Sequence, residues 1–327
     1  FIGSHTCVEL LTKNYTIVAI DNLSNSDISV VDNIKLITRK SVIFHQLDIL
    51  DHEGLKQLFL EYKFDAVIHF AGYKSVNESL KSPLKYYFNN LYGTMILCDV
   101  MRHFNVKKLI FSSSATVYGN TKKVPIKEDF PTSAVNPYGE SKLLVEHYLE
   151  RIAAQELDWD IIALRYFNPV GAHKSALIGE QPLGKPNNLM PYLLMVASKK
   201  FEELLIFGDD YPTKDGTGVR DYIHVSDLAI AHVKSLDYLL SDKSTNVTIE
   251  KINIGTGNGY SVLEMLNAFA KFNNVIIPYK IVGRRAGDSA ESFSDSSYAL
   301  EKLGWKASKN LKDMCVDSWK WELNRLK

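Results

Sequence analysis

The sequence predicts an α/β fold in which a doubly wound parallel sheet is joined to a smaller α/β lobe. Short apolar segments alternate with segments of helical spacing through the first half of the chain. Hydrophobic residues make up 46% of the sequence and charged residues 23%, as in ordinary globular proteins. The 327 residues exceed the size of a usual single core, so a second lobe is expected.

The elements of the larger domain are expected in regular alternation. The predicted strands lie at 16–21, 42–48, 66–69, 108–113 and 161–165, and the predicted helices at 4–13, 53–62 and 83–104. Pro83 stands at the start of the last helix, where the missing N–H of proline costs no hydrogen bond. Strands that alternate with helices are joined by right-handed crossovers, and this predicts a parallel sheet.

The regular pattern ends after Asn168-Pro169. Glycines and prolines interrupt the sequence between 171 and 186, and this predicts a domain boundary. We therefore expect one domain over 1–169 and a second over 170–327. Further helices are expected at 190–199, 225–240, 261–272 and 311–325, and short strands at 251–254 and 280–282.

Charge and cysteine usage exclude several classes of partner. The chain has 38 basic and 38 acidic residues and no basic stripe, which argues against nucleic acid and anionic membranes as partners. Cys7, Cys98 and Cys315 are too scattered for a disulfide framework or a metal site, so we expect no metal and a reducing, cytoplasmic location. No apolar stretch reaches the roughly eighteen residues of a membrane span.

The opening residues predict a dinucleotide site. Phe1-Ile2-Gly3 looks like the end of a glycine-rich Rossmann loop, and Asp21 follows the next strand at the distance where an acid binds the adenosine ribose. A carboxylate there selects NAD over NADP, although an acid that only caps a turn is the alternative. On this interpretation the first strand is missing from the chain, and we expect such a truncated fragment to bind NAD poorly.

Other strand ends point to the same cofactor. Asp48-Ile49 follows one predicted strand and Phe70-Ala71-Gly72 follows another, at the sheet edge where α/β proteins bind ligands. Gly72 would permit a close approach of the backbone to the ligand. Lys74 and Asn89 could reach the pyrophosphate or the nicotinamide ribose, or could be a solvated residue and a helix cap.

Three further residues indicate a chemistry. Ser114 follows a predicted strand, and Tyr138 and Lys142 stand four residues apart, on one helical face. An ammonium beside a phenol favours the phenolate, and with an oxidised nicotinamide it would bring the phenol pKa from near 10 toward neutrality. The alternative is that the Tyr/Lys pair is a solvated surface pair, as most such pairs are.

Five segments together resemble the UDP-galactose 4-epimerases of the extended short-chain dehydrogenase/reductase superfamily, and the resemblance covers essentially the whole chain. They lie at 1–7, 67–72, 112–119, 164–173 and 216–225. The resemblance implies that Ser114, Tyr138 and Lys142 are the catalytic residues. It also implies an NAD-binding domain over 1–169 and a nucleotide-sugar-binding domain over 170–327.

The resemblance further implies two sets of binding residues. The cofactor set is Phe1, Ile2, Asp21, Asn22, Asp48, Ile49, Phe70, Ala71, Gly72, Lys74, Asn89 and Phe167, with the catalytic three. The substrate set is Asn168, Asn188, Leu189, Phe207, Arg220, Arg285, Asp288 and Ser292. Two arginines can neutralise a pyrophosphate and an aromatic ring can pack against uracil, whereas the alternative for Arg220 and Arg285 is surface salt bridges.

The activity implied is reversible epimerisation at C4 of UDP-galactose and UDP-glucose through a 4-keto sugar. Tyr138 would remove the proton of the 4-hydroxyl, directly or through Ser114, while NAD accepts the C4 hydride and later returns it to the other face. Ser292 stands where some members carry a tyrosine. The smaller side chain should leave room for a 2-acetamido group, so UDP-N-acetylglucosamine and UDP-N-acetylgalactosamine are expected as further substrates.

Two other functions stay open at this point. A nucleotide-sugar 4,6-dehydratase needs an acidic pair soon after the serine, and 115–118 contains no Asp or Glu. A nucleotide-binding regulatory protein without turnover is the second alternative. The resemblance also implies a homodimer formed through helices at 83–104 and 138–155, and it leaves open whether a further domain such as a mutarotase follows Lys327.

Overall fold

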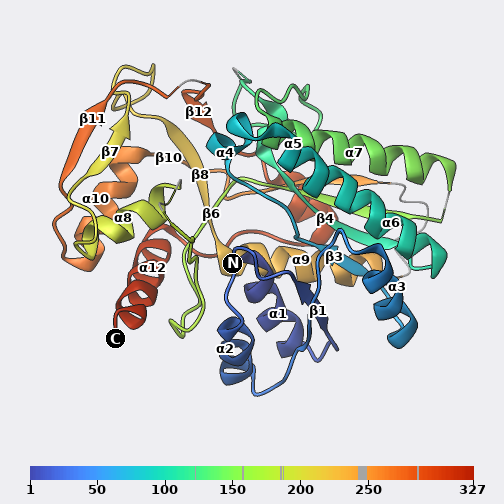
Figure 1. The fold of residues 1–327 in the computed structure, drawn as a ribbon. Coiled ribbons are helices and arrows are strands. Elements are labelled where there is room, and N and C mark those ends of the chain that lie inside the picture. The colour runs from blue at the N-terminus through green and yellow to red at the C-terminus, as the bar shows by residue number, and fades with distance from the viewer. Residues whose placement is uncertain (122, 157, 185, 187, 242–248, 286) are drawn as a thin grey trace.

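The fold was analysed in a computed structural model that describes residues 1–327 except 122, 157, 185, 187, 242–248 and 286. Figure 1 shows a larger part built around the parallel strands and a smaller part that contains β7, β11, α8, α10 and α12. The α/β class and the additional lobe predicted from the sequence are thus confirmed.

The parallel sheet of the larger part lies in two ladders. The strands β3 (Val67–His69), β4 (Lys108–Ser114), β5 (Asp160–Tyr166) and β9 (Glu250–Ile254) pair in that order, all parallel. The strands β1 (Val18–Asp21) and β2 (Ile43–Gln46) form a second parallel pair. Within the described residues β1 and β3 are not paired with each other.

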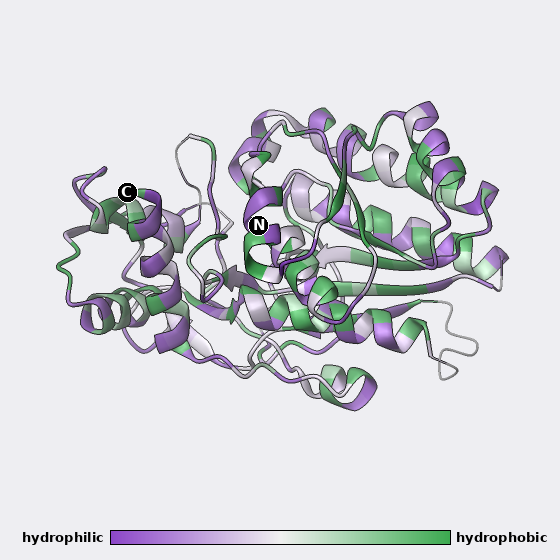
Figure 2. Cartoon of the chain, turned by 90° about the horizontal axis from the view of Figure 1, so that it is seen from below, coloured by the Kyte–Doolittle hydropathy of each residue, from purple (hydrophilic) through white to green (hydrophobic). Residues whose placement is uncertain are grey.

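Successive residues of the central strands face opposite layers of helices. Leu109 and Phe111 of β4 pack with α3 (His52–Glu61), α6 (Gly93–His103) and α7 (Pro137–Gln155). Ile110, between them, packs with α1 (Ile2–Thr12), α9 (Val225–Leu239) and α11 (Ser297–Leu303). This alternation is the period of a strand that is buried on both faces. Figure 2 shows hydrophobic and hydrophilic residues side by side along the helices, as amphipathic helices require.

The helix expected over 83–104 is divided by a π-helical turn. It consists of α5 (Pro83–Tyr86), the turn η1 (Tyr87–Tyr92) and α6. One inserted residue in such a turn rotates the side chains that follow it, and π-turns often occur at functional sites. Three α-helices that pack in the larger part were not predicted, α2 (Ser29–Thr38), α4 (Val76–Lys81) and α11.

The smaller lobe is built on two short sheets. The strand β7 (Leu204–Phe207) pairs in parallel with β11 (Tyr279–Val282). The strand β8 (Val219–His224) pairs with β6, β10 and β12, which span Asn168–Val170, Gly259–Ser261 and Glu291–Ser292. The helices α8 (Leu189–Ala197), α10 (Val262–Asn273) and α12 (Leu311–Arg325) enclose the core of the lobe.

The chain crosses between the two parts more than once. The strand β9 and the helix α9 follow residue 170 in the sequence, but β9 pairs with β5 and α9 packs on α1. Figure 1 accordingly shows α9 beneath the parallel strands, next to α1. No single cut of the chain would therefore separate the residues of the larger part from those of the smaller lobe.

Candidate active site

Ser114 and Tyr138 come together because a strand end and a helix start are in contact. Ser114 is the last residue of β4, and its Oγ accepts hydrogen bonds from the amide and the hydroxyl of Thr116 at 3.2 and 2.9 Å. The helix α7 begins beside it, where Asn136 Oδ1 accepts from the amide of Gly139 at 2.9 Å. A Cβ at Gly139 would lie 2.9 Å from the carbonyl oxygen of Thr116, so only glycine allows this approach.

Lys142 is buried one turn further along α7. Its side chain donates to the carbonyl oxygen of Ser112 at 2.7 Å and lies 4.9 Å from the centre of the Phe111 ring. Burial lowers the pKa of Lys142 to about 8, against the opposing charge of Glu146. The alternative of a solvated surface lysine is therefore wrong, because Lys142 is only 5% exposed.

Tyr138 differs in part from the expectation. The pKa of its phenol is raised, because burial outweighs the hydrogen bond from Ser114 and the positive charge of Lys74. The cation that acts on the phenol in this structure is thus Lys74, whereas Lys142 is directed to the Ser112 carbonyl. Lowering of this pKa by an oxidised nicotinamide stays a prediction.

A buried ion pair supports these residues from behind. The carboxylate of Glu146 on α7 accepts from Arg165 of β5 at 3.0 and 2.6 Å and from the Ser113 hydroxyl at 2.5 Å. Arg165 also donates to the Tyr118 hydroxyl at 2.8 Å. Glu146 and Arg165 are at most 1% exposed, and they fix α7 against β4 and β5 on either side of Ser114.

The strand ends of β1 and β2 bring the predicted ribose residues together. The side-chain amide of Asn22 donates to Asp48 Oδ2 at 2.8 Å. Asp21 Oδ1 accepts from the Leu23 amide and the Ser26 hydroxyl, each at 2.8 Å. Asp21 therefore does cap a turn, as the alternative interpretation had it. It lies opposite Gln46 in the parallel pair of β1 and β2, two residues before Asp48.

Gly72 lies where the cofactor-side residues meet the catalytic helix. A Cβ at Gly72 would lie 3.4 Å from the ammonium of Lys142 and 3.2 Å from Asn90 Oδ1. Asn90, in the π-turn, accepts from the amide of Tyr73 at 2.8 Å and donates to the Ser141 hydroxyl at 3.0 Å. Asn89 donates to Asn90 at 3.1 Å, so Asn90 ties the loop after β3 to α7.

The remaining residues predicted for the cofactor lie on several elements. A Cβ at Gly3 would lie 3.4 Å from the Phe70 ring, and the centre of that ring is 4.8 Å from the centre of the His232 ring, with the two planes tilted by 46°. Ile49 is buried under Gly93. The other predicted members are the start of α1 (Phe1, Ile2), Ala71 after β3, and Phe167, which is buried beside Val117 and Tyr118.

The predicted nucleotide-sugar residues surround β8 and the end of β7. The guanidinium of Arg285 lies 4.3 Å from the centre of the Phe207 ring. Arg220 donates to the Ser289 carbonyl at 3.0 Å, and its guanidinium is 4.0 Å from Asp288. Ser292 lies opposite Arg220 in the register of β12 and β8.

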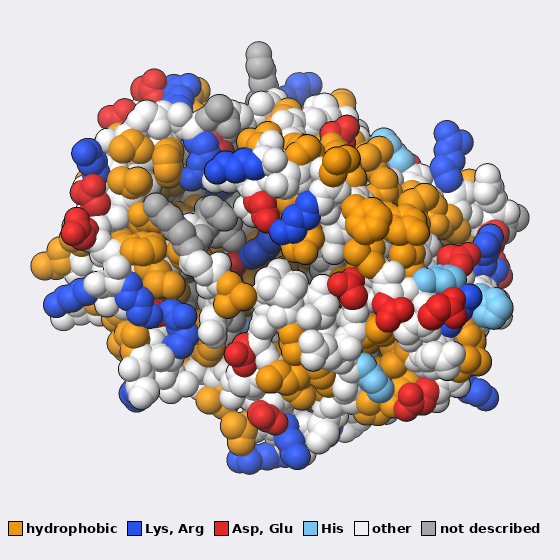
Figure 3. All heavy atoms as spheres, in the orientation of Figure 1, with side chains coloured by type: hydrophobic (Ala, Val, Ile, Leu, Met, Phe, Trp, Pro, Cys, Tyr) orange, Lys and Arg blue, Asp and Glu red, His pale blue; other side chains and the backbone are white. Residues whose placement is uncertain are grey.

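The alternative of surface salt bridges fits these arginines poorly. The Arg220 contact with Asp288 is long, and among the ion pairs of the described residues Arg285 has none. Asn168 lies opposite Tyr222, while Asn188 and Leu189 begin α8. In Figure 3 Lys and Arg side chains gather at the border between the lobe and the larger part.

Comparison with known proteins decides the family. The chain matches the family model described as GDP-mannose 4,6 dehydratase over residues 1–318. It is 53% identical over 322 residues to a UDP-glucose 4-epimerase of Bacillus subtilis (strain 168), covering 98% of this chain and 94% of that protein. A Dictyostelium discoideum protein of the same name is 54% identical, with 98% and 93% covered.

The chain belongs to the UDP-glucose 4-epimerase family. Its fold superposes with a TM-score of 0.96 on the UDP-glucose-4-epimerase of Stenotrophomonas maltophila, solved with NAD and formylated UDP-arabinopyranose, at 51% identity over 100% of this chain and 97% of that one. The Bifidobacterium longum enzyme, solved with NAD+ and UDP, gives 0.95 at 47% identity, with 100% and 96% covered. The resemblance stated from the sequence is thus confirmed.

Within this epimerase fold, four residues that contact the site were missed by sequence reasoning. They are Asn90, Glu146, Arg165 and Glu180, and each acts through residues distant in the sequence. Glu180 accepts from Lys74 at 2.5 Å and from Asn188 at 3.3 Å, so it touches one predicted cofactor residue and one predicted substrate residue. Loss of hydration lowers the pKa of Lys74, although its side chain is 60% exposed, but the charge and the hydrogen bond of Glu180 raise it by more, so the net direction is upward.

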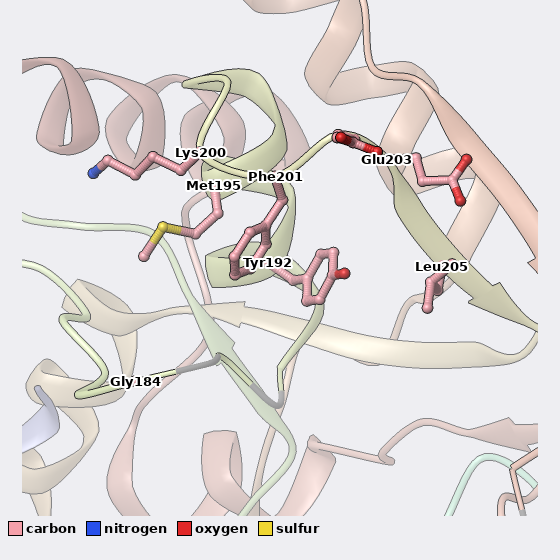
Figure 4. A pocket seen from close by; sticks show the side chains of 8 residues that line it. Gly184, Tyr192, Met195, Lys200, Phe201, Glu203 and Leu205 are labelled. Atoms are coloured by element: carbon pink, nitrogen blue, oxygen red, sulfur yellow. The ribbon is translucent and has the colours of Figure 1, made fainter.

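Other features of this epimerase-family chain lie away from the site. A surface pocket of about 660 Å³ on the lobe contains no predicted site residue (Figure 4), and it is lined by Gly184, Tyr192, Met195, Lys200, Phe201, Glu202, Glu203 and Leu205. Over the described ranges, no cluster of His, Cys, Asp and Glu could hold a metal ion. No helix in that part of the chain is sufficiently long and apolar to cross a bilayer.

Proposed function

We propose that this chain interconverts UDP-galactose and UDP-glucose by inverting the sugar at C4, with a tightly held NAD. The observation that carries the proposal is that the buried Ser114 and Lys142 and the half-buried Tyr138 meet at the carboxyl end of β4. Open α/β sheets bind ligands at that edge. Proteins of the same family, about half identical over nearly the whole chain, carry the name of this activity.

The residues present suit NAD. Gly72 leaves open a space beside the Lys142 ammonium that the Cβ of any other residue would fill. The carboxylates of Asp21 and Asp48 follow the neighbouring strands β1 and β2, where they can accept hydrogen bonds from ribose hydroxyls. When bound, NAD supplies the acceptor and donor of the C4 hydride. The related enzymes of Stenotrophomonas maltophila and Bifidobacterium longum were solved with NAD bound.

The chain's own residues manage the proton. Tyr138 takes the proton of the sugar 4-hydroxyl and returns it after the sugar has turned, directly or through the Ser114 hydroxyl. Lys142 supplies a buried positive charge close to the strand end and fixes the Ser112 carbonyl. Because no carboxylate stands at 115–118, no residue there can eliminate water, and this favours epimerisation over dehydration.

The lobe residues retain the nucleotide while the sugar turns. Arg220 and Arg285 offer forked donors to a diphosphate, and Phe207 offers a ring face to uracil. Asn168, Asn188, Leu189 and Asp288 complete this proposed set. Firm contacts to the uridine diphosphate and few contacts to the sugar let the 4-keto sugar rotate without escaping.

Turnover with UDP-galactose tests the function. UDP-glucose should form, and NADH should not accumulate in solution, since the hydride returns to the sugar. A 4-keto-6-deoxy product would instead establish a dehydratase. Bound nucleotide without any product would establish a regulatory protein.

We also propose that UDP-N-acetylglucosamine and UDP-N-acetylgalactosamine are substrates. The specific observation is Ser292, a small residue placed opposite Arg220 at the proposed diphosphate site. Ser292→Tyr should reduce turnover of the acetamido sugars by about 10- to 200-fold and leave UDP-galactose turnover nearly unchanged. Wild-type protein that turns over UDP-galactose but neither acetamido sugar would contradict the proposal.

A homodimer is proposed through α5, η1 and α7. Leu84, Phe88 and Tyr92 are 80%, 57% and 47% exposed, and the last two rings stack at 5.1 Å. Figure 3 shows hydrophobic side chains gathered over this region, and exposed apolar patches of this kind mark protein interfaces. The double change Leu84→Asp and Phe88→Asp should give a monomer in sedimentation velocity, whereas Leu60→Asp, 66% exposed on α3, should not.

Two organisational proposals complete the function. We propose an NAD-binding domain over 1–169 and a nucleotide-sugar-binding domain over 170–327, with β9 and α9 returning to the first. We also propose a cytoplasmic location, supported by the free thiols of Cys7, Cys98 and Cys315. Cell fractionation with thiol labelling of unfolded protein tests the location.

A further inference from the structure

Glu180 connects the two parts of the molecule at the site. Its side chain is 11% exposed. The carboxylate Oε1 accepts from Lys74 Nζ at 2.5 Å and from Asn188 Nδ2 at 3.3 Å. Lys74 follows β3 of the larger part, and Asn188 precedes α8 of the lobe. One oxygen atom thus joins a predicted cofactor residue to a predicted substrate residue.

The backbone at Glu180 is anchored independently of this side chain. The indole Nε1 of Trp321, on α12, donates to the Glu180 carbonyl at 3.4 Å. A Cβ at Gly179 would lie 2.6 Å from the same indole, so glycine is needed for the chain to pass so close. Gly179 also forms an antiparallel bridge with Ala172. A change of the Glu180 side chain should therefore leave the course of the loop intact.

The carboxylate of this pair differs from that of an exposed ion pair, although Lys74 itself is 60% exposed. Glu53, paired with Lys56 at 3.2 Å on α3, is 75% exposed and has no second part of the molecule to join. Exposed pairs of that kind are screened by solvent and add little to position. Glu180 is largely buried and has two donors from different domains, so the same chemistry can fix a relative position.

We propose that Glu180 is a positioning residue that couples the binding of the dinucleotide to the binding of the nucleotide diphosphate. The inference rests on the proposed function and adds a means by which one ligand senses the other. A ligand that orders Lys74 also orders Glu180, and through it Asn188, so the second ligand finds its residues already placed. Coupling of this kind is reciprocal, so UDP must slow NAD release as NAD strengthens UDP binding.

The coupling has a path to the reacting groups. The charge of Lys74 acts on the phenol of Tyr138, while Trp321 and Gly179 fix the loop that carries Glu180. Occupation of the nucleotide site should therefore also stabilise the position of the cation beside the phenol. Loss of Glu180 should lower kcat and raise KM together, because Lys74 and Asn188 both lose the partner that they share.

The test is the rate of NAD release from the protein with and without UDP. In the wild type UDP should slow release by about fivefold or more, within the usual range of coupling between sites. In Glu180→Ala this ratio should fall close to one. Glu180→Gln retains an acceptor oxygen but loses the charge-assisted bond, which is about twice as strong as a neutral one, so its ratio should lie between.

Controls separate positioning from folding and from the proposed function. Glu53→Ala should leave the ratio at the wild-type value, and thermal melting reports whether each variant is folded. If Glu180→Ala does not fold, a ratio in Glu180→Gln equal to the wild type overturns the inference. A wild type that epimerises UDP-galactose while both Glu180 variants keep its ratio overturns the inference alone. A wild type with no turnover and no UDP binding overturns the proposed function and, with it, this inference.

Discussion

The catalytic residues and the nucleotide-binding residues are built in opposite ways. Ser114 and Lys142 are at most 8% exposed and rest on the buried pair of Glu146 and Arg165. The side chain of Arg220 is 21% exposed, and its partner Asp288 is 34% exposed. Ser114 and Lys142 are thus enclosed by protein and Tyr138 is half-buried beside them, whereas the groups proposed for binding keep one side toward solvent.

This difference follows from what each region has to do. Proton transfer fails when groups move by a fraction of an ångström, so rigid burial is worth its cost in stability. A diphosphate brings its own charge, and arginines that are partly solvated can meet it without a large prior loss of hydration. We call the region around Ser114, Tyr138 and Lys142 the buried side, and the region around Phe207, Arg220 and Arg285 the open side. The comparison predicts that substitutions on the buried side greatly reduce the rate, and that substitutions on the open side weaken substrate binding by graded amounts.

The largest effect is expected for Tyr138→Phe. The variant lacks the hydroxyl that takes the sugar proton, so kcat for UDP-galactose should fall by about 10²- to 10⁴-fold. Folding and UDP affinity should stay close to the wild type, because the ring is retained. Initial rates and UDP titrations measure both.

The matched control for this change is Tyr279→Phe. Tyr279 lies on β11 of the lobe and is 48% exposed. It should retain the wild-type rate. If both variants turned over UDP-galactose at the wild-type rate, the residues around Ser114 would have no part in the chemistry. The proposed difference between catalytic and nucleotide-binding residues would then be wrong.

The second effect is on stability, from Lys142→Met. The pKa of Lys142 is lowered from 10.5 to about 8, which corresponds to about 3 kcal/mol. Between these values the unfolded chain binds the proton that the folded chain has released, so the free energy of unfolding rises with pH from about 8 to 10.5. Lys142→Met should lack this rise while it loses activity.

Urea unfolding at a series of pH values from 7 to 10 measures this effect as the difference between wild type and variant. Subtraction removes the titration of all groups that both proteins share. A stability difference that did not change with pH would mean that Lys142 is not a buried charge in the folded protein. Lys280→Met, an exposed lysine on β11, is the control and should show no such pH dependence.

The same contrast explains what the sequence could predict. The sequence shows the four-residue spacing of Tyr138 and Lys142 and the apolar strand pattern that precedes Ser114. These three residues could therefore be predicted. Asn90 was not, because its partners Tyr73 and Ser141 are 17 and 51 residues away. Nothing in the apolar pattern of 83–104 marks the π-turn that presents Asn90.

Glu180 and α2 were missed for different reasons. Glu180 stands among glycines and prolines, where no period exists, and its role depends on Lys74, 106 residues away. The helix α2 contains Val30, Val31 and Ile34, β-branched residues that weaken a helical signal when packing is unknown. Long-range packing against α1 supplies the stability that local propensity does not.

A third, smaller effect separates neighbouring arginines of the open side. Arg285→Ala should raise KM for UDP-galactose by about 10- to 100-fold, because a charged hydrogen-bonding group contributes about 1.5–3 kcal/mol. Arg284 lies next to it in the chain, but it is ion-paired with Asp210 and lies 4.2 Å from the Tyr211 ring. Arg284→Ala should change KM less.

Initial rates at low and high salt measure this third effect. The KM of the wild type should rise with salt, and that of Arg285→Ala should rise less, because a solvent-facing charge is screened. Equal changes of KM in the two arginine variants would show that the open side binds by general positive charge alone. The proposed site would then extend beyond Arg285.

The smallest effect is expected for Phe207→Leu. Leucine retains the apolar contact but removes the ring that lies 4.3 Å from the Arg285 guanidinium, and such contacts contribute about 0.5–1.5 kcal/mol. The KM should therefore rise by only about 2- to 10-fold, and kcat should be unchanged.

The double variant of Phe207→Leu and Arg285→Ala completes a double-mutant cycle. If ring and guanidinium bind the nucleotide as one unit, the double variant should be less impaired than the sum of the single changes. Additive losses would show that the two side chains act separately, so that the open side, unlike the buried one, is a set of independent contacts.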